Sequence, residues 1–140
     1  MTGPTANEQE QERATHNVAR LRLANGPLVA PVLWRVVSMM LARADWPVDR
    51  FDDALIVCDA LQAHAPAYAS DGRLAFSVRA NEQEAELRVL ELSEQDAAGL
   101  VEDAILPLVG NVLERVAERV RVEPDEQGKS HRVAIVLSAG

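Results

Sequence analysis

The sequence predicts an α/β (α+β) two-layer sandwich, with helices on one face of a mixed, mostly antiparallel sheet. Segments with strand periodicity cluster as hairpins instead of alternating one by one with helices, and this order favours helices segregated on one side of a sheet. Apolar residues make up 48% of the 140 residues and aromatic residues only 4%, so aliphatic side chains must build the core. This length and composition are typical of one globular domain.

The N-terminal third is predicted to hold a tail, a strand and a helix. Residues 1–16 are polar and carry no periodic apolar positions, so we expect a flexible N-terminal tail and a single domain over residues 17–140. Residues 19–23 alternate apolar and charged side chains, which predicts a short half-buried strand. From Leu28 to Leu41 the apolar residues recur at i, i+3, i+4 and i+7, the stripe of an amphipathic helix.

A second helix and a hairpin are predicted next. The helix runs from Phe51 to about Ala65, because its apolar residues share a face and three aspartates crowd its first turn, where the helix dipole favours negative charge. The turn at residues 70–72 then leads into two alternating segments, residues 74–78 and 87–92. Their spacing predicts a β-hairpin.

The C-terminal third is predicted to hold a third helix and two more strands. Residues 93–102 form an acidic connection with some helical character, and a strong apolar stripe predicts a helix over residues 105–119. Two strands follow, at residues 120–122 and 131–138, on either side of a Pro-Asp-Glu-Gln-Gly turn.

Composition excludes several functional classes. The net charge is −8, which disfavours nucleic acid and anionic membrane surfaces as partners. No apolar run reaches the roughly 20 residues that a membrane span requires, and the first residues do not resemble a secretory signal. Cys58 is the only cysteine, so neither an intrachain disulfide nor a multi-cysteine metal site is possible. We expect a cytoplasmic protein.

One segment points to a family. The run Leu-Ile-Val-Cys-Asp-Ala-Leu-Gln-Ala-His at residues 55–64 places an acid at Asp59 and an alanine four residues later, at Ala63. In size, element order and this pattern, the chain after residue 18 resembles the histidine-kinase-like ATPase superfamily (the GHKL or Bergerat fold). Within it, the chain is most similar to the small stand-alone anti-sigma-factor serine kinases. The resemblance implies that Asp59 occupies the general-base position of a catalytic site and that residues 17–140 form a domain of this type.

The chain departs from the family at all three nucleotide motifs. Ala63 stands where the family has an asparagine that helps hold the metal, and alanine has no oxygen to offer Mg²⁺. Residues 90–99 stand where the family has Asp-x-Gly-x-Gly, and the paired glycines are missing. Residues 106–110 replace a glycine-rich lid with a single glycine, too few to cradle a triphosphate with backbone N–H groups. We therefore expect no cofactor and no metal.

The predicted function is that of a degenerate, non-catalytic, anti-sigma-factor-like regulatory protein that acts by protein–protein binding. The resemblance implies a sigma factor or an anti-sigma antagonist as partner, and a possible homodimer. The alternative is a divergent ATP-dependent protein serine kinase that uses ATP, Mg²⁺ and Asp59 to phosphorylate an anti-sigma antagonist. A third option is an unrelated sandwich; the resemblance requires a long helix pair on one face of a four- or five-stranded sheet.

Other candidate residues have structural interpretations. Residues 128–130 (Gly-Lys-Ser) resemble the end of a P-loop, but Glu123 stands where that motif needs a glycine and a strand follows, so a hairpin turn is predicted. Cys58 lies on an apolar stripe and is predicted to be buried. Trp34 lies off the apolar stripe of the first helix. It is predicted to lie either at the edge of the core or on a binding surface, and a place at the edge of the core is favoured. The three histidines are predicted to be isolated: His16, His64 and His131.

Overall fold

The computed structural model describes residues 17–69, 71–105 and 116–140. The described strands are β1 (Val18–Ala24), β2 (Arg73–Ala80), β3 (Glu84–Leu92), β4 (Arg119–Pro124) and β5 (His131–Ser138). The described helices are α2 (Val29–Arg43), α3 (Phe51–His64) and α4 (Glu94–Leu100). Short helical turns precede α3 (Val48–Arg50), follow α3 (Ala65–Tyr68) and follow α4 (Val101–Ile105). The expected N-terminal tail, most of the expected third helix and the lid position at residues 106–110 lie outside the described residues.

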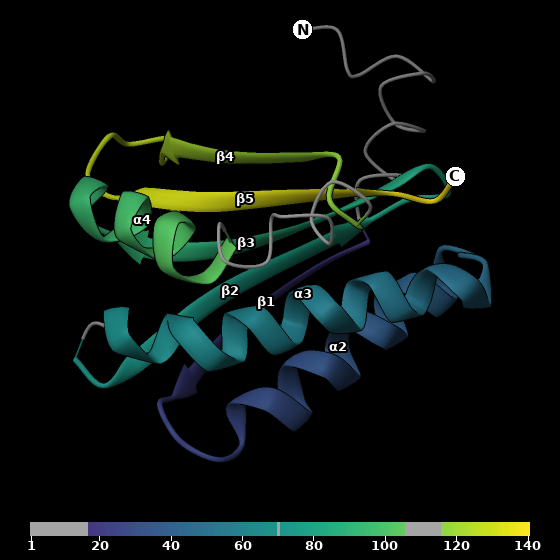
Figure 1. Ribbon diagram of the computed structural model, residues 1–140, viewed down its shortest axis with the longest axis horizontal. Coiled ribbons are helices and arrows are strands. Elements are labelled where there is room, and N and C mark those ends of the chain that lie inside the picture. The colour runs from purple at the N-terminus through teal and green to yellow at the C-terminus, as the bar shows by residue number, and fades with distance from the viewer. Residues whose placement is uncertain (1–16, 70, 106–115) are drawn as a thin grey trace, which may run out of the picture.

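The five strands form one sheet in the order β1-β2-β3-β5-β4, and each neighbouring pair is antiparallel. The helices α2 and α3 lie side by side over one face of this sheet, and α4 covers its other end on the same side (Figure 1). The predicted two-layer α+β class is therefore confirmed, with an antiparallel sheet in the described part of the chain. Strands β1 and β4 are the two edges.

The core lies between the helices and the sheet, and it is almost entirely aliphatic. Helix α2 buries residues spaced three or four apart: Val29, Leu33, Val37, Met40 and Leu41. The sheet contributes every second residue of each strand, as its pleat requires, and Phe76 in β2 is the largest fully buried side chain. Because the described helices lie on one face of the sheet, the alternate residues of every strand point to a face that no described helix covers.

The two tryptophans of the chain contact this core. Trp46 is 5% exposed, and its indole Nε1 donates a hydrogen bond of 2.7 Å to the carbonyl oxygen of Asn81. This bond joins the segment after α2 to the turn between β2 and β3. Trp34 is half-buried and packs against the core, which supports the edge-of-core interpretation.

One predicted boundary is wrong. The third helix was expected to continue to Arg119, but Val116 is the last helical residue and β4 already begins at Arg119. The physical reason is the alternation of Arg119 and Arg121 with Val120, because this period of two suits the pleat of an edge strand that pairs with β5 along its whole length.

Strand β3 contains an irregularity that its sequence hints at. The buried apolar residues Leu87 and Val89 are two positions apart, but the next one, Leu92, follows three positions later. The register of the pairing with β5 shifts between Val89 and Leu92. Glu91 has a φ of 60° there. Such a bulge inserts one extra residue and turns the side chains next to it.

None of the described helices is long and apolar enough to cross a membrane.

Candidate functional site

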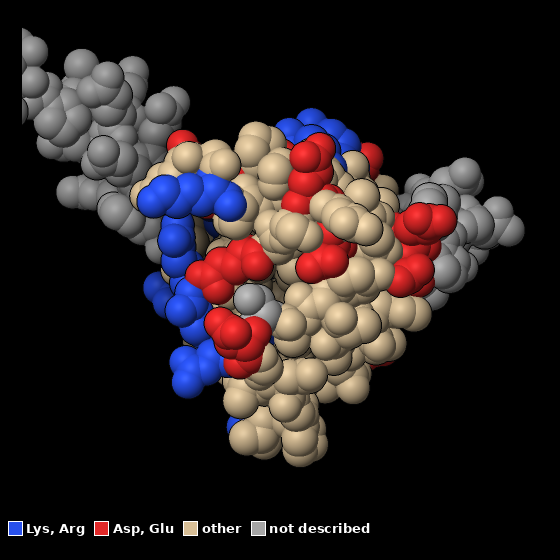
Figure 2. Space-filling model, turned by 90° about the vertical axis from the view of Figure 1, so that its left-hand side faces the viewer, with Lys and Arg blue, Asp and Glu red and all other residues tan. Residues whose placement is uncertain are grey.

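The uncovered face of the sheet concentrates the basic residues of this acidic chain. Strand register and alternation with core residues place eight arginines on that face: Arg20, Arg22, Arg73, Arg79, Arg88, Arg119, Arg121 and Arg132. We call this set the arginine face. The chain has only 14 basic residues and a net charge of −8, so more than half of its positive charge lies on one surface. Figure 2 shows Lys and Arg side chains gathered along one side of the molecule.

Glutamates neutralise part of this charge. The strands of the same face carry Glu84, Glu86, Glu91 and Glu123. Eight arginines against these four glutamates leave a formal charge of +4 on the strands, and Asp125 and Glu126 in the adjoining turn add two negative charges. Five of the eight arginines have a carboxylate oxygen within 4.0 Å: Arg22, Arg88, Arg119, Arg121 and Arg132. Arg20, Arg73 and Arg79 have no such partner among the described residues. The arginine face therefore presents positive charge that the described part of the chain does not use.

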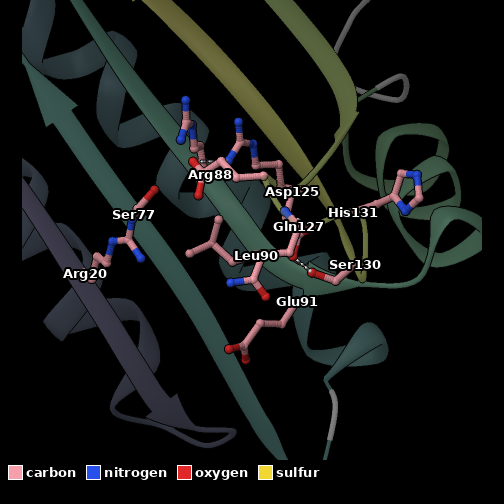
Figure 3. Close-up of a pocket in the computed structure, with 11 residues that line it drawn as sticks. Arg20, Ser77, Arg88, Leu90, Glu91, Asp125, Gln127, Ser130 and His131 are labelled. Carbon is pink, nitrogen blue, oxygen red and sulfur yellow. Dashed lines mark hydrogen bonds and ion pairs between the residues drawn. The ribbon is translucent and has the colours of Figure 1, made fainter.

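A hollow of about 320 Å³ opens in this face (Figure 3). One side of it is a row across three strands, because Arg20 in β1 lies opposite Ser77 in β2, which lies opposite Arg88 in β3. Its remaining wall comes from the end of β3 and from the turn between β4 and β5. We call it the Ser77 hollow, and its lining residues are Arg20, Ser77, Arg88, Leu90, Glu91, Asp125, Glu126, Gln127, Ser130, His131 and Arg132.

Ser77 and Arg88 are the two buried polar residues of the described chain. They are 4% and 9% exposed, respectively. The Arg88 Nε donates to a Glu86 carboxylate oxygen, so the buried guanidinium has a counter-charge. The Ser77 Oγ, in contrast, is closed to solvent and has no hydrogen-bond partner. Buried polar groups are nearly always hydrogen-bonded in folded proteins, and among the described side chains only the Asn17 Oδ1 shares this unpaired state.

The turn between β4 and β5 is held rigid by Asp125. Its Oδ1 accepts hydrogen bonds from the backbone N–H groups of Gln127 (3.1 Å) and Lys129 (2.9 Å), and its Oδ2 accepts one from the Ser130 hydroxyl (2.9 Å). These bonds outweigh the effect of burial and hold the pKa of Asp125 below its ordinary value. Gly128 adopts a φ of 70°, which glycine tolerates best. The predicted hairpin turn is thus confirmed.

Arg132 and Glu123 form a partly buried ion pair beside the hollow, with 2.8 Å between Arg132 Nε and Glu123 Oε1. Burial raises the pKa of Glu123, but the hydrogen bond and charge of Arg132 lower it by more, so the pKa in the folded state lies below the ordinary value of 4.5. The same contacts raise the pKa of Arg132, although burial acts in the opposite direction.

This pair predicts a pH-dependent contribution to stability. A carboxylate whose pKa is lowered on folding stabilises the fold fully above its unfolded pKa, and the contribution disappears as the pH falls through its folded pKa. We expect Glu123→Gln to destabilise the protein at pH 7, and we expect this loss to shrink below about pH 4.5. Urea unfolding of both proteins at pH 7 and pH 3 measures it. The exposed Glu82 provides a control, since Glu82→Gln should have little effect at either pH. An equal loss from Glu123→Gln at both pH values would contradict the prediction.

The family-derived positions lie elsewhere. Asp59 and Ala63 are exposed on α3, in the helix layer on the opposite side of the sheet from the arginine face. Residues 90–99 form the end of β3 and most of α4, where the Ser93 side chain caps the helix by accepting a hydrogen bond of 3.0 Å from the backbone N–H of Asp96. Within the described residues, no three or more His, Cys, Asp or Glu side chains are grouped to hold a metal ion.

No known family model and no curated protein matches this chain.

The remaining candidate residues have structural roles. Cys58 is 3% exposed, and burial, with a smaller contribution from Asp59, raises the pKa of its thiol to about 12. A thiol with this pKa is fully protonated at neutral pH and is a poor nucleophile. His131 borders the hollow, but its ring points away from the other labelled side chains (Figure 3). His16 lies outside the described residues.

The arginine face is the functional feature that the sequence motifs did not reveal. Part of its signal was present, because arginine alternates with an apolar residue in Arg-Leu-Arg at residues 20–22 and in Arg-Val-Arg at residues 119–121. Taken alone, the sequence of each strand predicts only an ordinary strand with one exposed face. Only the pairing of β1 with β2, and of β3 with β5, brings the arginines of separate segments onto one surface.

Proposed function

We propose that this chain is a non-catalytic regulatory protein that binds an acidic surface of another protein through its arginine face. The observation that carries the proposal is the concentration of eight arginines on the sheet face that none of the described helices covers. Complementary charge steers partners together and excludes wrong ones. Arginine is also enriched at protein interfaces, because its planar guanidinium binds carboxylates with two parallel hydrogen bonds.

The partner is proposed to be a protein and not a nucleic acid. Sheets that bind single-stranded nucleic acid stack the bases on aromatic side chains. The outward positions in the centre of this sheet are instead aliphatic, namely Ala75, Leu90, Ala134 and Val136. Glutamates are also interleaved with the arginines, and they would repel a phosphate backbone. Small aliphatic residues between arginines suit a protein surface better.

The resemblance to anti-sigma-factor serine kinases narrows the proposal. A fold of this family has a long helix pair on one face of a four- or five-stranded sheet. In this chain α2 and α3 pack together on one face of a five-stranded sheet, which supports the resemblance. We therefore propose a cytoplasmic, anti-sigma-factor-like regulator whose partner is a sigma factor or an anti-sigma antagonist, and whose work requires neither ATP nor Mg²⁺. The exposed Asp59 is then a vestige of the general-base position.

Charge reversal on the arginine face tests the proposal. The partner would be captured from the native cell with the full chain, identified by mass spectrometry, purified and titrated against variants. Arg73→Glu with Arg79→Glu changes two arginines without described carboxylate partners on β2, and we expect binding to weaken at least about tenfold. The matched control is Arg35→Glu with Arg43→Glu, an equal charge change on α2. Equal weakening by both pairs would contradict the proposal.

Two further measurements complete the test. Binding through the arginine face should weaken as ionic strength rises, because salt screens exposed charges beyond about 8–10 Å. Calorimetry with ATP and Mg²⁺ addresses the kinase alternative. Nucleotide binding that Asp59→Ala weakens would overturn the non-catalytic assignment.

A further inference from the structure

We infer that the Ser77 hollow receives one carboxylate group, from an aspartate or glutamate side chain of the protein partner. The inference rests on the proposed function, since it names the point on the arginine face where the partner is held. Four observations carry it: the buried hydroxyl, the unused hydrogen-bond donors around it, the charge of the lining residues and the size of the hollow.

The hydroxyl of Ser77 is the first observation. The Ser77 residue is only 4% exposed, and its Oγ has no hydrogen-bond partner. It lies between Arg20 and Arg88 in one cross-strand row, and Figure 3 shows it between those two side chains at the edge of the hollow. A hydroxyl in this position can donate its proton to an acceptor that enters beside it. Arg20, which is exposed, is the neighbour that can move to admit one.

The unused donors are the second observation. Arg20 has no carboxylate within 4.0 Å in the described part of the chain, and Arg88 bonds Glu86 through Nε, which leaves its two terminal nitrogens without a described hydrogen bond. The three acids of the lining already have partners, because Asp125 holds the turn, Glu91 pairs with Arg22 and Glu126 pairs with Arg132. The hollow therefore offers donors, and it fits a ligand that brings acceptors.

Charge selects among the ligands that bring acceptors. The lining holds three arginines and three acids, the latter being Glu91, Asp125 and Glu126, so its formal charge is zero. A carboxylate brings this total to −1, and Arg20 is the lining arginine without a described carboxylate partner. A phosphate dianion adds two and faces the same three acids, and like charges repel at short range. The balance favours a carboxylate.

The shape suits a side chain that projects from a partner surface. The hollow measures about 320 Å³, at the lower limit of pockets that bind small molecules. It opens on a broad face whose other arginines can contact the surroundings of that side chain. Arginine and carboxylate have matching planar geometry, so Arg20 and Arg88 can bind its two oxygens while Ser77 donates to one of them.

The test uses acetate and inorganic phosphate as probes of the hollow. The full chain is titrated with sodium acetate at constant ionic strength, against sodium chloride, and the NMR signals of the Ser77 amide and of the Arg20 and Arg88 Nε–H groups are followed. We expect acetate to shift these signals, and Ser77→Ala to weaken acetate binding about tenfold, because hydrogen bonds to charged groups are the strong ones. Ser77→Ala removes one buried unsatisfied oxygen from the fold, so the variant should remain folded.

Matched variants separate the hollow from the rest of the face. Ser138→Ala removes a hydroxyl from an outward position of β5 outside the hollow, and it should leave acetate binding unchanged. Arg20→Gln should weaken acetate binding, whereas Arg79→Gln, an identical change on the same face outside the hollow, should not. Equal acetate binding by Ser77→Ala and the unmodified protein would overturn the inference. Tighter binding of phosphate than of acetate would overturn the choice of a carboxylate.

The last part of the test measures binding of the same variants to the protein partner. Ser77→Ala and Arg20→Gln should each weaken the complex. If neither does, while Arg73→Glu with Arg79→Glu abolishes it, the inference is wrong and the proposed function stands. If acetate binds in the hollow but charge reversal leaves the complex intact, the proposed function is wrong, and the inference about the partner falls with it.

Discussion

Replacing Glu86 by alanine is expected to lower the free energy of unfolding by about 3 kcal/mol, the lower end of the cost of leaving a buried charge without its partner. Glu86 is the counter-charge of Arg88, and the two side chains are 15% and 10% exposed. Without Glu86, the Arg88 guanidinium stays in the middle strand of the sheet with no described carboxylate oxygen within 4.0 Å. We choose the lower end because a residual exposure of 10% lets water reach part of the group.

The double variant Glu86→Leu with Arg88→Met is the control for this prediction. Replacing both charges by apolar side chains removes the attraction and the desolvation cost together, so we expect stability within about 1 kcal/mol of the unmodified protein. Urea unfolding of the single and double variants measures both values. A double variant as unstable as Glu86→Ala would show that packing, and not the unpaired charge, determines the loss.

Replacing Phe76 by alanine is expected to cost about 3–5 kcal/mol of the free energy of unfolding. Phe76 is the largest fully buried side chain and is 1% exposed. It lies on β2, between β1 and β3 and under the helix layer, so its removal leaves a cavity in the centre of the core. This is a large part of the 5–15 kcal/mol that holds a typical domain folded.

Phe51 provides the matched control, because the chain has only two phenylalanines. Phe51 is half-buried at the start of α3 and packs against the edge of the core. Phe51→Ala should therefore cost about 1–2 kcal/mol, less than the full burial of a phenylalanine side chain contributes. Thermal and urea unfolding of both variants give the comparison. Equal losses would indicate that the centre of the core is not where the structure places it.

The helices and the hairpins could be predicted because their signals are local. The apolar stripe from Leu28 to Leu41 identifies α2, which spans Val29–Arg43, and the alternating residues 131–138 match β5. The fold class follows from their order. The end of the third helix could not be placed, because Arg119 continues a helical face as readily as it begins a strand.

The candidate site could not be predicted, because it depends on non-local pairing. An outward-facing serine in a two-faced strand is normally exposed, yet Ser77 is buried because strands lie on both sides of it and carry Arg20 and Arg88. The burial of Arg88 depends in the same way on its place in the middle of the sheet. The family resemblance instead predicted a site at Asp59, which lies on α3 in the helix layer.

The edges of the sheet have a consequence for how copies of this protein behave toward one another. Among the described strands, β1 and β4 each have a single neighbour, and a strand with a bare edge is a template for another chain. Arg20 and Arg22 line one edge strand and Arg119 and Arg121 the other, so two sheets joined end to end would align like charges. We expect these arginines to disfavour open-ended polymerisation. Threonines in their place would favour fibre growth at high concentration.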